Sequence, residues 1–289
     1  MPDYTNTLER ADQLLETRGI KGHRAADRFC KDFRAYLVFF DAMGYGSAEH
    51  TVELLENDNC LTDSQCLNRN FRGTLNDLVS QKLREDGIFP SLFEILMDNN
   101  GKGVGAGELA LPLVLSDYRF SNDSDGVFGD NRKVEIKKNG ASLKPIKTGL
   151  TPKGLVDELN NRYFQGTVPG KKKQSLVERH LRTVKDPSVY REYFAELYPG
   201  CDTESLAREV EKVYRDPELF NRAVGRFALR EYQRVDGWNN IIYIDSENGR
   251  VVNIADPGSV DELGLRFSPV LRRGSDTQAI ADGYVNVSI

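Results

Sequence analysis

The stretch KVEIKK at residues 133–138 alternates apolar and charged side chains, which is typical of a β-strand with chemistry on one face. Successive side chains of a strand point to opposite faces, so Val134 and Ile136 are expected to enter a core. Glu135 and Lys137 then stand beside each other on the other face. The pattern therefore predicts a strand that fixes a carboxylate and an ammonium group as neighbours.

A second strand is expected directly upstream. Residues 125–128 and 132–138 flank Gly129-Asp130-Asn131, which has the residue types of a hairpin turn. Asp125 would begin the first of these strands and lie next to Glu135. Asp123 or Asp130 could take its place after a small change of register, but Asp125 is preferred because it begins an apolar run.

A glycine-rich run, residues 101–107, leads into Glu108. It is not a Walker loop, because the Gly-Lys-Ser/Thr ending is absent, and it does not meet the dinucleotide-binding pattern. A flexible approach for a nucleic-acid backbone, or tight packing around a helix that carries Glu108, is expected instead. Pro112 predicts that this helix starts late or kinks.

Length and composition leave the function open but exclude some classes. The 289 residues are 39% hydrophobic and 29% charged, enough for one large domain or two smaller ones with a core. No long apolar span or leader pattern occurs, so we expect a cytoplasmic protein without a membrane partner. Four cysteines without a CxxC pair predict reduced thiols and no zinc site. A net charge of -5 still permits a nucleic-acid enzyme whose lysines gather locally.

The chain is expected to divide into an N-terminal helical segment, residues 1–97, and a main domain, residues 98–289. A helical insertion is expected at about residues 166–216 of the main domain. A second hairpin is predicted at residues 240–254, around a Ser-Glu-Asn-Gly turn. The tail from Arg272 lacks periodicity and is expected to wrap the surface.

Within the N-terminal segment, apolar positions recur at helical spacing. Ser47 or Thr51 can cap one helix, and residues 71–83 and 90–97 are expected to form two more. Their aromatic residues are interpreted as core. A strand is also expected at residues 118–120, ahead of the hairpin.

The acids suit one particular chemistry. Hydrolysis of a phosphodiester needs a divalent metal held by oxygen ligands, an aligned water and positive charge near the developing negative charge. Asp125 and Glu135 can supply ligands, with the Ile136 carbonyl as a third. Lys137 can orient or help deprotonate the water. Glu108 could bind a second ion or brace a bound water.

The order Glu108, Asp125, Glu135-Ile136-Lys137 resembles the PD-(D/E)xK nuclease superfamily over about residues 101–140. The resemblance implies an α/β, restriction-endonuclease-like mixed sheet flanked by helices. Helix 217–234 and strand 241–244 would close that core. Ser124 precedes Asp125 where the family name has proline.

The resemblance also implies a function. The chain would be a Mg²⁺-dependent deoxyribonuclease, with Mn²⁺ as a substitute and endonuclease action expected. Its metal ligands would be Asp125, Glu135, Ile136 and Glu108, and Lys137 would complete the catalytic set. The glycine-rich lead and residues 125–128 are also similar to nuclease-like proteins of tailed phages. This leaves open a noncatalytic phage structural or assembly protein, a homodimer, and a location in the host cytoplasm or the virion.

Lysines near the predicted site could contact DNA phosphates and provide affinity without sequence preference. The alternative is a set of ordinary solvated side chains. The predicted DNA contacts are Lys138, Lys144, Lys147, Lys171, Lys172 and Lys173.

Overall fold

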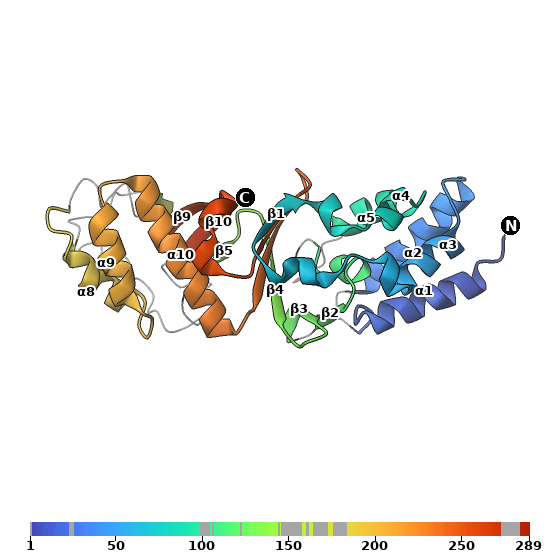
Figure 1. The fold of residues 1–289 in the computed structure, drawn as a ribbon, viewed down its shortest axis with the longest axis horizontal. Helices are drawn as coiled ribbons and strands as arrows, with labels where there is room; N and C mark the ends of the chain where they lie inside the picture. The colour runs from blue at the N-terminus through green and yellow to red at the C-terminus, as the bar shows by residue number, and fades with distance from the viewer. Residues whose placement is uncertain are drawn as a thin grey trace. The chain divides into compact units, whose positions relative to one another are not determined.

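The computed structural model describes residues 2–22, 26–98, 105, 107–121, 123–143, 145, 158–159, 162–163, 173–175, 184–272 and 284–289. Contacts divide the chain into two compact units. The first contains residues 1–139 and 238–256, and the second contains residues 140–237 and 257–289. Each unit has its own sheet, and Figure 1 labels the elements along the chain.

Helices occupy most of the N-terminal part of the first unit, as the sequence predicts. The side chain of Ser47 caps α3 by accepting a hydrogen bond from the His50 N–H at 3.3 Å, so the first of the two predicted caps is the one used. Pro90 lies in the first turn of α5, where a missing N–H costs no helical hydrogen bond. The helices are α1 (Thr5–Thr17), α2 (Ala26–Ala42), α3 (Ala48–Glu56), α4 (Gln81–Glu85) and α5 (Phe89–Met97).

The helix predicted for residues 71–83 is wrong in its first half. Strand β1 (Phe71–Thr74) pairs antiparallel with β8 (Arg250–Ile254), and the 3-10 helix η3 (Leu75–Leu78) follows it. The Asp77 carboxylate accepts the Thr74 N–H at 2.7 Å and so starts η3. Because the partner strand lies far away in the sequence, local apolar spacing could not reveal this pairing.

The first unit contains a six-stranded sheet in the order β1-β8-β7-β4-β3-β2. Strands β4 and β7 run parallel, and every other pair is antiparallel. This mixed sheet with its helices confirms the predicted α/β class, and both predicted hairpins are present. The remaining strands are β2 (Tyr118–Ser121), β3 (Ser124–Phe128), β4 (Lys133–Lys138) and β7 (Asn240–Asp245).

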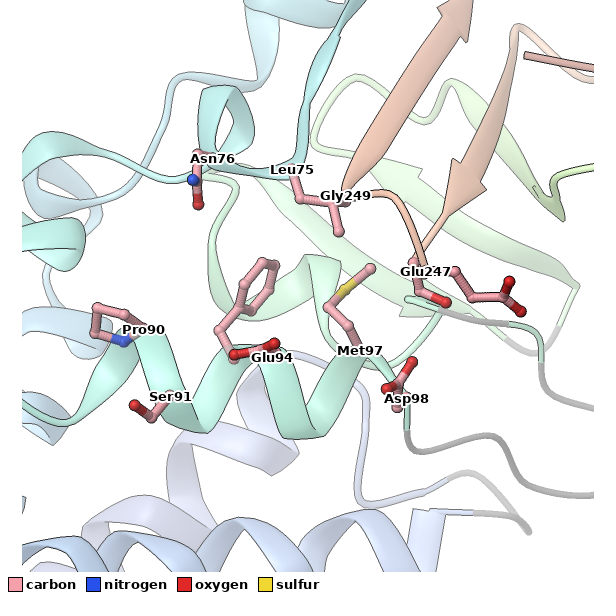
Figure 2. A pocket seen from close by; sticks show the side chains of 11 residues that line it. Leu75, Asn76, Pro90, Ser91, Glu94, Met97, Asp98, Glu247 and Gly249 are labelled. Atoms are coloured by element: carbon pink, nitrogen blue, oxygen red, sulfur yellow. The ribbon is translucent and has the colours of Figure 1, made fainter.

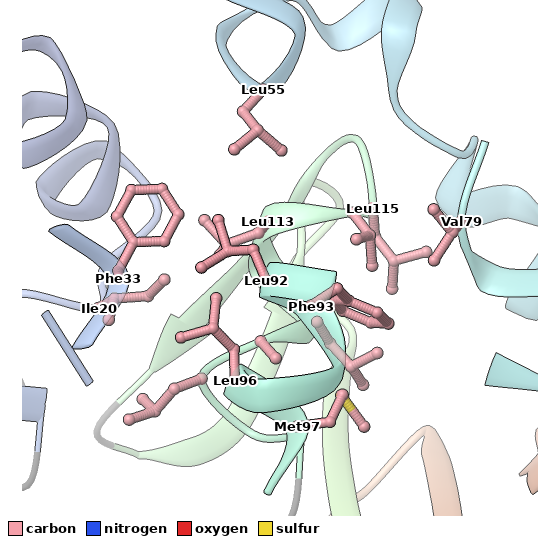
Figure 3. Packing of buried hydrophobic residues seen from close by; sticks show 14 of the residues in the cluster. Ile20, Phe33, Leu55, Val79, Leu92, Phe93, Leu96, Met97, Leu113 and Leu115 are labelled. Carbon is pink, nitrogen blue, oxygen red and sulfur yellow. The ribbon is translucent and has the colours of Figure 1, made fainter. Parts of the chain in front are cut away.

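Helices and sheet of the first unit share one hydrophobic core. Val134, Ile136 and Ile242 extend from the sheet into the same buried cluster as the apolar faces of α1, α2, α3 and α5. Figure 3 shows Leu92 and Leu96 of α5 within this cluster. Fully burying each such side chain contributes about 1.5–3 kcal/mol. Residues 1–97 therefore pack as part of the first unit, and the division between units falls elsewhere than the predicted boundary at residue 97.

Among the described residues, the second unit contains a four-stranded antiparallel sheet in the order β5-β10-β9-β6 and helices of 9 to 20 residues. Asp216 caps the longest helix through the N–H groups of Glu218 and Leu219, and Gly237 ends it with a positive φ of 73°. The elements are β5 (Ser142–Leu143), β6 (Lys173–Ser175), α8 (Val189–Leu197), α9 (Thr203–Val213), α10 (Pro217–Asp236), β9 (Arg266–Arg272) and β10 (Tyr284–Ser288).

Two expectations about this part of the chain are corrected. Helix α10 belongs to the second unit, where it packs against β9, and is not a closing element of the mixed sheet. The tail is not simply wrapped on the surface, because β10 pairs with both β5 and β9. Of the predicted insertion, α8 and α9 are described, while residues 164–172 and 176–183 lie outside the described part of the chain.

Candidate active site

Strand β4 divides its side chains between two environments, as its sequence alternation predicts. Val134 and Ile136 are 0% and 2% exposed and belong to the core of the first unit. On the other face, the ammonium group of Lys137 donates a hydrogen bond to Glu135 Oε1. A buried carboxylate and an ammonium are thus held together on one short strand.

Asp125 joins this pair from the neighbouring strand. Strand β3 pairs with β4 through Gly126–Val134 and Val127–Lys133, and Asp125 directly precedes the paired residue Gly126. The Asp125 carboxylate accepts the backbone N–H of Ile136 at 2.7 Å. In a regular strand pair, a backbone carbonyl of the neighbouring strand would accept this N–H. Here the Asp125 carboxylate accepts it, and the hydrogen bond holds the Asp125 side chain between the two strands.

The fourth residue, Glu108, lies in a tight turn and not on the helix that was predicted. Gly107 has a φ of +82°, and the Glu108 carboxylate accepts the Gly105 N–H at 2.6 Å. Only the 3-10 helix η4 (Leu111–Leu113) follows, and Pro112 lies within it. Because proline lacks the N–H that continues an α-helix, the chain turns here while keeping Glu108 buried at 8% exposure.

The three carboxylates act on one another electrostatically. Burial raises the pKa of Asp125 to about 7, with further upward contributions from the charges of Glu135 and Glu108. Burial likewise raises the pKa of Glu108, the Gly105 N–H opposes it, and the charge of Glu135 adds to the increase. Lys137 lowers both pKa values. The structure thus brings Glu108, Asp125, Glu135 and Lys137 into one electrostatic environment.

The alternative aspartates lie outside this environment. Asp130 is an exposed turn residue whose carboxylate binds Arg132 at 2.7 Å, and this pairing lowers its pKa. Asp123 is also exposed. Neither is buried with Glu135, so the geometry favours Asp125 as the partner of the Glu-x-Lys strand.

The chemistry of the donor atoms suits a hard divalent cation, since Asp125, Glu135, Glu108 and the Ile136 carbonyl offer oxygen only. Within the described part of the chain, however, no group of three or more His, Cys, Asp or Glu side chains converges to hold a metal ion. Mg²⁺ usually takes one or two carboxylates and completes its shell with water. One or two of the carboxylates of Asp125, Glu135 and Glu108 would meet that smaller requirement.

The predicted DNA-binding lysines are mostly not tested by the structure. Lys138 is exposed at the end of β4, and its ammonium lies 3.7 Å from a carboxylate oxygen of Glu247. Lys173 belongs to β6 of the second unit. The other four, Lys144, Lys147, Lys171 and Lys172, lie outside the described residues.

Sequence reasoning missed two tyrosines that border the acids. The hydroxyls of Tyr118 in β2 and Tyr243 in β7 are buried and have no hydrogen-bond partner among the described residues. Tyr243 pairs in register with Lys137, and the charge of Glu135 acts on its phenol. A tyrosine in a strand is usually a core residue, so only the register of the neighbouring strands reveals their position.

A separate pocket of about 440 Å³ lies between α5, η3 and the β7–β8 turn (Figure 2). Phe93 and Met97 form apolar parts of its lining, and the carboxylates of Glu94, Asp98 and Glu247 add negative charge. None of the four residues of the acidic site lines this pocket.

Among the helices that the structure describes, none is long and apolar enough to cross a membrane.

Comparison of the chain with protein-family models, curated proteins and solved structures finds no match. The resemblance to PD-(D/E)xK nucleases therefore depends on the residues and geometry described above.

Proposed function

We propose that the first unit is a Mg²⁺-dependent deoxyribonuclease of the PD-(D/E)xK type, with Mn²⁺ as a substitute. The observation that carries this proposal is the arrangement of Asp125 and the Glu135–Lys137 pair on adjacent strands. Asp125 is fixed by the Ile136 N–H, and Glu135 by Lys137. An acid and an acid-x-lysine on neighbouring strands are the parts that metal-assisted phosphodiester hydrolysis requires.

Each side chain has a defined task in this proposal. Asp125 and Glu135 hold the cation, which when bound supplies positive charge to the phosphate. Lys137 orients the attacking water and favours loss of its proton, because its ammonium lies beside Glu135. The water gives a proton to solvent as its oxygen bonds to phosphorus and the P–O bond to the leaving sugar oxygen breaks, and that sugar oxygen takes up a proton from solvent. The products are a phosphate monoester and a hydroxyl group.

The test is cleavage of supercoiled plasmid, linear duplex and single-stranded DNA after the protein has been treated with a chelator. Mg²⁺ or Mn²⁺ should restore cleavage, whereas Ca²⁺ should support DNA binding without efficient cleavage. Cleavage of supercoiled plasmid would identify endonuclease action, because a closed circle has no end at which an exonuclease could start. Activity with Zn²⁺ alone, or no cleavage of any substrate, would contradict the proposal and favour a noncatalytic structural or assembly protein.

A further inference from the structure

The pocket between α5, η3 and the β7–β8 turn has walls that the first unit holds in place. The Leu75 N–H of η3 donates a hydrogen bond to the Gly249 carbonyl of the turn at 2.9 Å. The turn is also fixed by Asp245, whose carboxylate accepts the side-chain and backbone N–H groups of Asn248 at 2.9 and 3.3 Å. The volume of about 440 Å³ lies within the range of small-molecule sites, about 300–1,000 Å³. The pocket is therefore preformed and large enough for a small ligand.

Helix α5 presents an apolar row and an acidic row to this pocket. Phe93 and Met97 are four positions apart, and so are Glu94 and Asp98. Figure 2 shows Glu94, Met97 and Asp98 on the pocket side of this helix. Phe93 and Met97 are 6% and 2% exposed, whereas both acids are exposed. Because a helix rises about 6 Å over four residues, each row repeats at about that distance.

The acidic row opposes the stability of the helix that carries it. Like charges four positions apart repel each other, and acids at the C-terminal end of a helix oppose its dipole. The last turn of α5 contains no basic residue, and no Lys, Arg or His is among the described residues that line the pocket. Within the described part of the chain, the carboxylates of Glu94 and Asp98 have no ion-pair or hydrogen-bond partner. The pocket thus lacks the cation that its charge favours.

These features define the chemistry of an occupant. The acidic row pairs with ammonium groups, and the apolar row packs against methylene groups. An aliphatic polyamine carries ammonium groups separated by three or four methylenes, and the four or five single bonds between them span about 5–6 Å. This spacing matches the repeat of the acids along α5. A lysine or arginine side chain has one charged end and pairs with only one acid of the row.

We propose that this pocket binds an aliphatic polyamine, whose ammonium groups pair with Glu94 and Asp98 and whose methylene groups lie on Phe93 and Met97. Glu247, on the β7–β8 turn, adds negative charge from the facing wall. The bound polyamine supplies the cation that the C-terminal end of α5 lacks. The inference does not depend on the proposed nuclease function, because no residue of the acidic site lines this pocket.

The test is calorimetric titration of the full-length chain with spermidine in magnesium-free buffer, beside a thermal melt. The wild type should bind spermidine, and its Tm should rise with spermidine concentration. The double variant Glu94→Gln/Asp98→Asn should bind about tenfold more weakly, because two surface charge pairs are lost. The matched control is Glu49→Gln/Glu53→Gln, which removes two exposed acids with the same spacing from α3. This control should bind spermidine as the wild type does.

Two further compounds separate the contributions of charge and methylene groups. An octanediol, which has the methylene chain without the charges, should not bind. Hexaamminecobalt(III), which has the three charges of spermidine without methylene groups, should bind about tenfold more weakly than spermidine, since each buried CH₂ contributes about fourfold in affinity.

Several results would overturn this inference. Absence of spermidine binding, or equal weakening in the two double variants, would mean that the pocket is not a specific site. Weaker binding in Asp125→Asn with none in Glu94→Gln/Asp98→Asn would mean that spermidine occupies the acidic site instead. Tighter binding of a tri-lysine peptide than of spermidine would mean that the pocket takes a basic protein segment. None of these measurements uses DNA cleavage, so failure of this inference is distinct from failure of the proposed function.

Discussion

The two units treat buried carboxylates in different ways. In the second unit, Glu231 is 6% exposed and its carboxylate binds Arg234 at 2.6 Å. In the first unit, the carboxylates of Glu108, Asp125 and Glu135 share an environment in which Lys137 pairs with Glu135 and lowers the pKa values of Glu108 and Asp125. Matching a buried charge with one partner suits a structural role, whereas clustering like charges opposes folding. Such a cluster in a folded protein points to function.

The largest expected effect separates the clustered acids from an ordinary one. Asp125→Asn and Glu135→Gln each remove a charge with little change of volume, so cleavage should fall below detection. The Tm should stay the same or rise, because repulsion among the acids decreases. Plasmid cleavage and a thermal melt measure the two effects. Asp130→Asn, in the exposed turn of the same hairpin, is the control and should be mild. An inactive Asp130→Asn beside an active Asp125→Asn would mean that Asp130 is the ligand.

The next effect separates two adjacent lysines. Lys137 donates a hydrogen bond to Glu135, whereas Lys138 is exposed and belongs to the opposite face of β4. Lys137→Ala should lower the single-turnover cleavage rate by about 10²–10⁴-fold, the usual contribution of a proton-transfer group, while DNA binding is retained. Lys138→Ala should cost little rate. Equal and small losses in both variants would remove the basis for a catalytic face on β4.

A third prediction compares one crowded glycine from each unit. A Cβ on Gly126 would lie 1.9 Å from Tyr118, and one on Gly225 would lie 2.1 Å from the Phe267 ring. Either substitution by alanine should destabilise the protein by about 1–3 kcal/mol, because the packed rings must move. Urea denaturation measures this loss. At a temperature where both variants are folded, only Gly126→Ala should also lower cleavage. Equal cleavage by the two variants would show that cleavage does not depend on the packing of the backbone next to Asp125.

The smallest effect concerns the paired acid of the second unit. Glu231→Gln should lower the free energy of unfolding by about 1 kcal/mol, since Arg234 is more than half exposed and solvent weakens the pair. Cleavage should be unchanged. Urea denaturation of Glu231→Gln beside Glu135→Gln decides the comparison: the first should lose stability and the second should not. If both variants lost the same free energy of unfolding, the two units would not differ in how a buried carboxylate contributes to stability.

Local sequence was sufficient for the elements that form from neighbouring residues. Gly129-Asp130-Asn131 and the turn at residues 246–249 predicted two hairpins that the structure contains. Ser47, one of the two residues expected as a helix cap, is the one that caps α3. Turn chemistry, capping and the alternation of a strand all act over a few residues, so a single stretch is enough to predict them.

Elements that depend on distant partners were not predictable in this way. Strand β1 forms because β8 supplies its hydrogen bonds, and β10 because it completes a sheet with β5 and β9. The sequence pattern of α10 predicts a helix but does not say which unit the helix belongs to. Its packing against β9 assigns it to the second unit. Non-local pairing supplies the hydrogen bonds and buried area that local propensity cannot specify.

In the candidate site, too, some features follow from local sequence and others only from the tertiary structure. By itself the sequence determined that Glu135 and Lys137 share a face and that Asp125 lies on the adjacent strand, because strand alternation and hairpin register are local geometry. Only the tertiary structure decided that Glu108 is buried in a turn, where the Gly105 N–H holds its carboxylate and its charge acts on Asp125. It also decided that the Tyr118 hydroxyl rests on Gly126, because that contact requires β2 to pack beside β3 in a particular register.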